Sequence, residues 1–138
     1  MSGTDTMVNA PELLKPRDVI GPGGLDQQWQ VFDYARLGLE FMAGHVPGSI
    51  HVDKALVWTE VDGVAGMLPR ALELAAALGS RGFDPSRPAL VLDGGNGLYA
   101  SRLVWALAVA GWERVALLEG GLAAWKAEGL PVKRGTAP

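Results

Sequence analysis

A short apolar strand, a glycine-rich turn and a long apolar helix follow one another over residues 88–110, and this succession constrains the fold most. The strand is predicted at 89–92, the turn begins at Asp93, and the helix continues to about residue 110. Open α/β sheets place ligands just beyond the carboxyl ends of their strands. A glycine loop that enters a helix also offers free backbone N–H groups to an anion. The sequence therefore predicts an α/β fold with its candidate site at this turn.

Short apolar segments alternate with helical ones through the rest of the chain. Strands are predicted at 29–33, 49–52 and 114–118, and helices at 36–42, 68–78 and 122–128. This alternation predicts a central parallel sheet of about five strands with helices on both faces. A capped helical turn is expected at 9–14, with Asn9 as the cap, and an irregular stretch at 53–66. We expect a disordered tail at 1–8 and a single domain over 9–134.

The composition excludes several classes of function. The net charge is -3 and the chain has no run of Lys and Arg, which argues against nucleic-acid binding. The longest apolar stretch is too short to cross a bilayer, and the N-terminus lacks the pattern of a secretory signal, so a cytoplasmic protein without a membrane partner is expected. The chain has no cysteine and two histidines. This excludes disulfides, thiolate metal sites and a cysteine nucleophile, and we expect no metal and no cofactor.

Three segments of the chain, taken in order, carry a resemblance to a known family. Residues 44–52 read Gly-His-Val-Pro-Gly-Ser-Ile-His-Val, and residues 92–97 read Leu-Asp-Gly-Gly-Asn-Gly with Ala-Ser-Arg following at 100–102. Residues 118–125 read Leu-Glu-Gly-Gly-Leu-Ala-Ala-Trp, with Gly-Leu-Pro-Val after them at 129–132. Together they resemble a rhodanese-like (sulfurtransferase) domain over about residues 29–133. The resemblance implies an α/β domain and a sulfur-transfer loop.

The chain departs from this family at the nucleophile. The resemblance implies a catalytic cysteine at the position of Asp93, where active members hold sulfur as a persulfide. The segment around Asp93 is similar to the non-catalytic N-terminal half of two-domain thiosulfate or 3-mercaptopyruvate sulfurtransferases, in which aspartate also stands at this position. The residues implied to form the active-site-like loop are Asp93, Gly94, Gly95, Asn96, Gly97 and Leu98. The glycines either allow tight turns with positive φ or let a ligand approach the backbone.

A carboxylate at position 93 changes what the loop can do. A carboxylate is a hard group that forms no stable persulfide, so thiolate-based sulfur transfer by this chain alone is excluded. An ionised Asp93 is expected to accept the loop N–H groups itself and to cap the following helix. An incoming anion would meet a like charge worth about 4 kcal/mol at about 4 Å in an effective dielectric near 20. We therefore expect weak anion binding or none.

Three further residues are candidates for supporting roles. Asp33 ends a predicted strand at the same sheet edge, and we expect it to order the neighbouring loops by hydrogen bonding; the family usually has an arginine next, where this chain has Tyr34. His45 is either a proton donor or a structural histidine in a turn. Arg102 either pairs with one of the two aspartates or is solvated. The tryptophans of the apolar helical segments, Trp105, Trp112 and Trp125, are expected in the core.

These observations leave several functions open. The leading hypothesis is a non-catalytic interaction, regulatory or sulfur-trafficking module whose partner is a sulfurtransferase component or a second copy of the chain. The apolar residues of 54–68, among them Leu56, Trp58 and Met67, either form such a surface or pack on the sheet. One alternative is half of a split thiosulfate sulfurtransferase completed by a cysteine-bearing chain. Another is an enzyme that uses Asp93 as a general base, or as a nucleophile toward a phosphoryl group.

Overall fold

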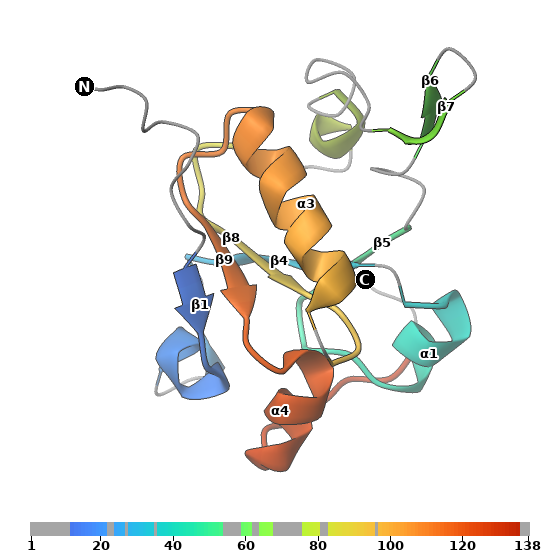
Figure 1. Ribbon diagram of the computed structural model, residues 1–138. Helices are drawn as coiled ribbons and strands as arrows, with labels where there is room; N and C mark the ends of the chain where they lie inside the picture. Colours follow the sequence, from blue (N-terminus) through green and yellow to red (C-terminus); the bar gives the residue numbers. More distant parts are fainter. Residues whose placement is uncertain are drawn as a thin grey trace.

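The computed structural model describes residues 12–21, 24–26, 28–34, 36–53, 59–61, 64–67, 76–80, 83–95 and 97–135. Its centre is a five-stranded sheet in the order β1-β9-β8-β4-β5, and every pairing within it is parallel. The strands are β1 (Glu12–Leu14), β4 (Gln30–Tyr34), β5 (Ile50–Val52), β8 (Ala89–Leu92) and β9 (Val115–Leu118). The predicted parallel sheet is thus confirmed (Figure 1).

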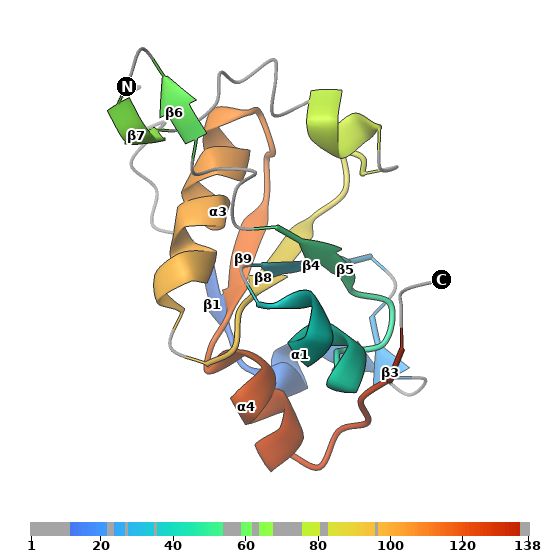
Figure 2. The same ribbon diagram turned by 90° about the vertical axis from the view of Figure 1, so that its right-hand side faces the viewer.

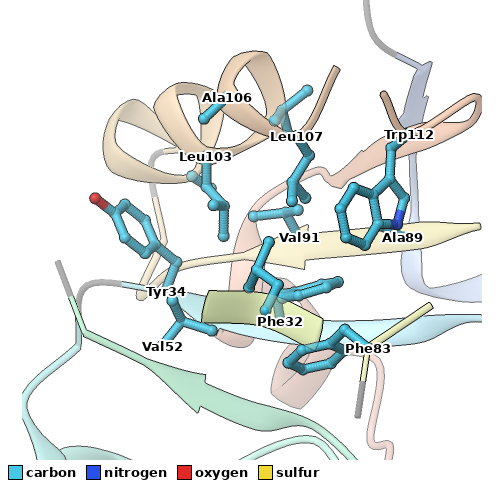
Figure 3. Close-up of a cluster of buried hydrophobic side chains, with 13 residues drawn as sticks. Phe32, Tyr34, Val52, Phe83, Ala89, Val91, Leu103, Ala106, Leu107 and Trp112 are labelled. Carbon is cyan, nitrogen blue, oxygen red and sulfur yellow. The ribbon is translucent and has the colours of Figure 1, made fainter. Parts of the chain in front are cut away.

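Side chains from both faces of this sheet are buried, which explains its continuous apolar strands. In β4, Phe32 and Tyr34 join a cluster that packs under α3 (Leu98–Val109), and Figure 3 shows them facing Leu103 and Leu107 of that helix. The alternate residue Val31 joins a second cluster with Leu122 and Trp125 of α4 (Gly121–Ala127). Helices therefore cover both faces, as the sequence predicts.

Helix α1 (Gly38–Ala43) and one end of the sheet form the region that contains the candidate site. This helix follows β4, and Figure 2 shows it at the same end of the sheet as α4. Both β4 and β8 have their carboxyl ends there, because the two strands are parallel and pair Asp33 with Leu92. This places the residues that end the two strands side by side.

The N-terminal segment differs from its prediction. Residues 12–14 form the edge strand β1, which pairs with β9 in the register Leu13–Leu117, so the capped helical turn is wrong for these residues; residues 9–11 lie outside the described part of the chain, as does the predicted tail at 1–8. A single helical turn gains too few hydrogen bonds to offset its nucleation cost. Pairing with the apolar strand β9 instead gives the backbone N–H and C=O groups of residues 12–14 their hydrogen-bond partners.

The segment after β5 also differs from its prediction. The irregular stretch expected at 53–66 contains an antiparallel pair, β6 (Thr59–Val61) and β7 (Val64–Met67). In the sequence they are separated by Asp62-Gly63, a dipeptide that favours hairpins. Residues 76–79 are helical, in agreement with the end of the helix predicted at 68–78, whose earlier residues 68–75 lie outside the described part.

Three smaller elements complete the described chain. A 3-10 helix, η2 (Pro16–Val19), follows β1, and the short strands β2 (Ile20–Gly21) and β3 (Gly24–Leu25) pair antiparallel. Val19 of η2 is fully buried in the cluster beneath α4. No helix among the described residues is long and apolar enough to cross a membrane.

Candidate active-site loop

The Asp93 side chain lies inside its own loop. It directly follows β8, and only 3% of its surface is exposed. Its Oδ1 atom accepts hydrogen bonds from the backbone N–H groups of Gly95 at 3.0 Å and Gly97 at 3.1 Å. Its Oδ2 atom accepts one from Ala100 at 3.0 Å. The carboxylate therefore occupies the cradle of N–H groups at the start of α3, as expected from the sequence.

Two glycines make this compact arrangement feasible. Gly97 is the N-cap of α3 and has φ of 80°, a left-handed conformation that disfavours other residues. Gly121, at the start of α4, has φ of 57° and lies against the Asp93 backbone. The expected positive φ is correct for Gly97 and wrong for Gly94 and Gly95, which do not adopt it. Asn96 lies outside the described residues.

Asp33 is the residue before the last one of β4, and it forms a buried ion pair. Its Oδ2 atom lies 2.7 Å from Nη1 of Arg36, with side-chain exposures of 0% and 8%. Burial raises the pKa of Asp33, while the charges of Arg36, His51 and His45 act in the opposite direction. Among the described residues, the other oxygen, Oδ1, has no hydrogen-bond partner. Asp33 is thus joined by an ion pair to Arg36, which lies in the segment after β4.

Arg36 is the functional residue that the sequence reasoning missed. Besides Asp33 it bonds the carbonyl oxygens of Glu40 at 2.5 Å and Gly44 at 2.9 Å through Nη2. Its guanidinium therefore joins Asp33 of β4 to the carbonyl groups of Glu40, within α1, and of Gly44, the C-cap of α1. The sequence offers only a partial signal, an arginine three residues after the aspartate of a predicted strand.

His45 is a structural residue of the turn after α1. It is 1% exposed, and its Nδ1 atom lies 2.9 Å from the Phe41 carbonyl oxygen. Its ring stacks on the Phe41 ring with centroids 3.9 Å apart, and its backbone pairs with Lys133. These contacts favour the structural alternative over that of a proton donor.

The positive charge of Arg102 favours the ionised form of the Tyr34 side chain. Asp33 pairs with Arg36, and Asp93 accepts backbone N–H groups, so the pairing of Arg102 with either aspartate stays a prediction. Burial raises the pKa of Tyr34 to about 12, although the positive charge of Arg102 opposes this shift.

A pocket of about 250 Å³ opens between α1 and the start of α3. It is lined by the two tyrosines, the two charged residues of the α1 region and the first residues of the loop, namely Tyr34, Tyr99, Arg36, Glu40, Asp93, Gly94 and Gly95. Of the predicted site residues, the structure thus gathers Asp93, Gly94 and Gly95 around one pocket. Leu98 is 67% exposed at the start of α3, and His45 is not among the lining residues.

The tryptophans separate into two groups. Trp112 and Trp125 are 5% and 2% exposed, which confirms them as core residues. Trp105 is 52% exposed, so its predicted core position is wrong. Helix α3 is apolar on nearly all sides, and its sequence period therefore does not distinguish the buried face from the exposed one. The side chains of the apolar segment 54–68 lie outside the described part.

Comparisons with known proteins show the family of this chain. Residues 25–128 match the family model described as a rhodanese-like domain. The chain is 33% identical over 96 residues to 3-mercaptopyruvate sulfurtransferase of Escherichia coli strain K12, covering 70% of this chain and 34% of that protein. It is 34% identical over 94 residues to thiosulfate sulfurtransferase of Azotobacter vinelandii, covering 68% of this chain and 35% of that protein.

Solved structures show the same relationship. The crystal structure of a 3-mercaptopyruvate sulfotransferase from Escherichia coli superposes with a TM-score of 0.76 at 25% identity, over 94% of this chain and 54% of that one. A 3-mercaptopyruvate sulfurtransferase from Leishmania major gives a TM-score of 0.74 at 23% identity, over 91% of this chain and 36% of that one, and shares the fold. The chain spans about a third of the length of the curated relatives that it matches.

Proposed function

This chain belongs to the rhodanese-like domain family, and we propose that it acts by binding a protein partner instead of transferring sulfur. In this proposal it is a cytoplasmic interaction, regulatory or sulfur-trafficking accessory module. The observation that carries the proposal is that the Asp93 carboxylate, at the position where the resemblance implies the nucleophile, accepts three backbone N–H groups of the loop.

The chemistry of sulfur transfer supports this proposal. A persulfide requires a thiolate, and the 138 residues contain no cysteine. Three backbone N–H groups of the loop, those of Gly95, Gly97 and Ala100, are bonded to Asp93 and are not offered to an incoming anion. The parallel sheet of the fold shared with the solved relatives is retained. A domain that keeps this fold but lacks the reactive thiolate is suited to binding a protein partner.

The same geometry speaks against Asp93 as a general base or as a nucleophile toward a phosphoryl group. Both carboxylate oxygens accept N–H groups, and the side chain is 3% exposed. A general base must reach the proton that it removes. Here the side chain reaches its own backbone instead.

Transfer assays test the proposal. The wild-type chain is expected to release no thiocyanate from thiosulfate and cyanide, or from 3-mercaptopyruvate and cyanide, and to bind no thiosulfate at millimolar concentration by calorimetry. Thiocyanate release by the wild-type chain would overturn the proposal. Asp93→Cys is the informative companion variant. Activity in this variant means that the site lacks only its nucleophile, and inactivity means that the loop shape is also unsuited.

A second candidate function is half of a split sulfurtransferase. It is favoured by the coverage of the relatives, which are named sulfurtransferases and match this chain over about a third of their own length. In this candidate a separate chain supplies the cysteine. The test is co-purification with a cysteine-bearing rhodanese-like chain encoded beside it, followed by the same assay on the complex and on each chain alone. Activity of the complex that exceeds the activity of the cysteine-bearing chain favours this candidate.

A further inference from the structure

The last described segment of the chain, residues 131–135, carries an inference about the partner. Resting on the proposed function, we infer that the open backbone edge of this segment, flanked by three basic side chains, binds an extended acidic segment of a partner protein as an added strand. Two independent observations support this inference. They are main-chain groups directed away from the rest of the domain, and a group of cations beside them.

One edge of this segment is bonded to α1 and to the turn that follows it. The backbone N–H of Lys133 donates to the His45 carbonyl oxygen at 2.8 Å, and the His45 N–H donates to the Lys133 carbonyl oxygen at 2.9 Å. These bonds form an antiparallel bridge between the two residues. The Gly135 N–H donates to the Met42 carbonyl oxygen at 2.8 Å. The main-chain groups of residues 133 and 135 are therefore used within the chain.

The opposite edge is formed by Val132 and Arg134. Along an extended chain the N–H and C=O groups of successive residues point to opposite sides, so those of Val132 and Arg134 are directed away from His45. Within the described ranges, no hydrogen bond joins these main-chain groups to the rest of the protein. Each of the two residues carries one donor and one acceptor. A peptide in the extended conformation can pair with such an edge.

Three basic side chains surround this edge. Lys133 and Arg134 belong to the segment, and both are exposed. Lys126, which is exposed in the last turn of α4, places its Nζ atom 3.9 Å from the position that a Cβ on Gly44 would occupy. Gly44 directly precedes His45, the residue to which Lys133 is bonded. The ammonium group of Lys126 therefore lies beside the same turn.

The acidic side chains of the neighbouring elements leave these charges in place. Glu128, which follows α4, pairs with Arg17 at 2.7 Å, and Glu40 of α1 accepts the Leu37 N–H at 3.0 Å. In the part of the chain that the structure describes, no carboxylate lies at ion-pair distance from any of the three basic side chains. The edge is therefore positively charged, although the net charge of the chain is -3.

The chemistry of the edge selects the partner. Its main-chain donors and acceptors are matched by another peptide backbone, which nucleic acids and lipid headgroups lack. A second copy of the same edge would bring three like charges against the first three, which opposes self-pairing. Acidic side chains on the added strand complement the charge instead. Met42, which is 42% exposed and bonded to Gly135, offers an apolar contact beside them.

Peptide titrations of the isotope-labelled full chain, followed by NMR, test this inference. The probe is acetyl-Glu-Val-Glu-Val-Glu-amide, and two matched peptides carry glutamine or lysine in place of every glutamate. The glutamate peptide is expected to bind with a Kd about tenfold or more below that of either matched peptide. The amide signals of Val132, Lys133 and Arg134 should shift. Binding should weaken when sodium chloride is added to about 0.5 M.

Backbone methylation separates strand pairing from simple charge attraction. In one version of the glutamate peptide both valine nitrogens are methylated, and in a second version the nitrogens of the last two glutamates are methylated. The charges of the peptide are the same in both versions. An added strand pairs through the main-chain groups of one side only, so one version is expected to lose binding and the other to keep it.

A charge-removing variant tests the role of the basic side chains. Arg134→Gln keeps the backbone of the edge and removes one charge, and it is expected to weaken binding of the glutamate peptide about threefold to fivefold. Arg87→Gln is the matched control, because Arg87 lies just before β8, at the end of the sheet opposite to α1. It is expected to leave binding unchanged.

Several results would overturn the inference. Equal affinity for the glutamine peptide, the same effect of both methylations, shifts located away from residues 131–135, or no binding of the glutamate peptide would each do so. Self-association of the unliganded chain through residues 131–135 would overturn the assignment to a different protein. None of these results bears on sulfur transfer, which the thiocyanate assay tests separately, so failure of the inference and failure of the proposed function are distinguishable.

Discussion

The backbone of Gly121 lies so close to Asp93 that a Cβ atom at position 121 would be 2.5 Å from the Asp93 carbonyl oxygen and 3.1 Å from the Gly95 nitrogen. The next residue, Leu122, donates its N–H to that same carbonyl at 3.2 Å. The start of α4 therefore buttresses the loop that holds the Asp93 carboxylate. The shape of the loop depends on a residue in a different element.

Gly121→Ala is expected to lower the free energy of unfolding by about 2–4 kcal/mol, because a Cβ would clash with backbone and a φ of 57° is strained for alanine. Urea denaturation measures the loss. Gly129→Ala is the control, since Gly129 has φ of 76° and open space around its Cβ position. An equal loss in both variants would show that strain alone, and not the approach to Asp93, is responsible.

Asp93→Asn is expected to lower the free energy of unfolding by about 1–3 kcal/mol. An amide has one acceptor oxygen, so its NH₂ group would face the N–H of Ala100 or those of Gly95 and Gly97. The exposed Asp18, which caps η2 through the Lys15 N–H, provides the control Asp18→Asn with a smaller expected loss. Denaturation curves compare the two. Full stability of Asp93→Asn would contradict the capping role of the carboxylate.

Asp33 and Asp84 are expected to give opposite pH dependences of stability. Burial raises the pKa of Asp33, so its contribution is complete below the unfolded value of 3.8 and is lost as the pH rises through the folded-state pKa. Hydrogen bonds from Ser86 lower the pKa of Asp84, so its contribution is present above 3.8 and is lost as the pH falls. For each variant we take the free energy of unfolding of the wild type and subtract that of the variant. This difference should decrease with rising pH for Asp33→Asn and increase with rising pH for Asp84→Asn. Slopes of equal sign would refute this assignment.

Arg36→Lys is expected to cost about 2 kcal/mol of stability, because one ammonium group cannot reproduce the bonds to Asp33, Glu40 and Gly44 that a planar guanidinium makes. Arg17→Lys is the control, since Arg17 pairs with Glu128 in solvent at 79% exposure. Its loss should be much smaller. Thermal and urea unfolding both measure the loss of stability in each variant. Similar losses in the two variants would show that the contacts of Arg36 do not stabilise the position of α1.

Trp105→Gln is expected to change the free energy of unfolding by less than about 1 kcal/mol, because half of the Trp105 surface is exposed. Trp125→Phe is expected to cost about 2 kcal/mol, since Trp125 is buried and donates its ring N–H to the Pro131 carbonyl at 2.7 Å. Denaturation of both variants measures the contrast. A large loss in Trp105→Gln would place this residue in the core after all.

The elements predicted correctly from sequence are those whose signals are local. The strand at 89–92, the turn and α3 lie within a single stretch of sequence, and so does the buried strand predicted at 29–33. Strand β1 was missed because nothing within residues 9–14 indicates its partner, which lies about a hundred residues later at Leu117. Its conformation is decided by that distant pairing.

The candidate site also has some features that local sequence predicts and others that depend on packing. The capping role of Asp93 follows from an acidic residue before a glycine turn, and it is present in the structure. The importance of Arg36 depends on where the ends of α1 fall relative to β4, and the position of Trp105 depends on which side of α3 meets the sheet. Both are properties of packing that a single sequence does not contain.

The edge strand β1 has a practical consequence for anyone who trims this protein. The match to the family model begins at residue 25, so a truncation drawn at that boundary would remove Glu12–Leu14. It would also remove the carboxylate that Arg114 contacts at 2.7 and 3.0 Å. The backbone of Val115–Leu118 would then be an unpaired apolar edge, open to strand pairing with a neighbouring molecule. Such a shortened protein should aggregate.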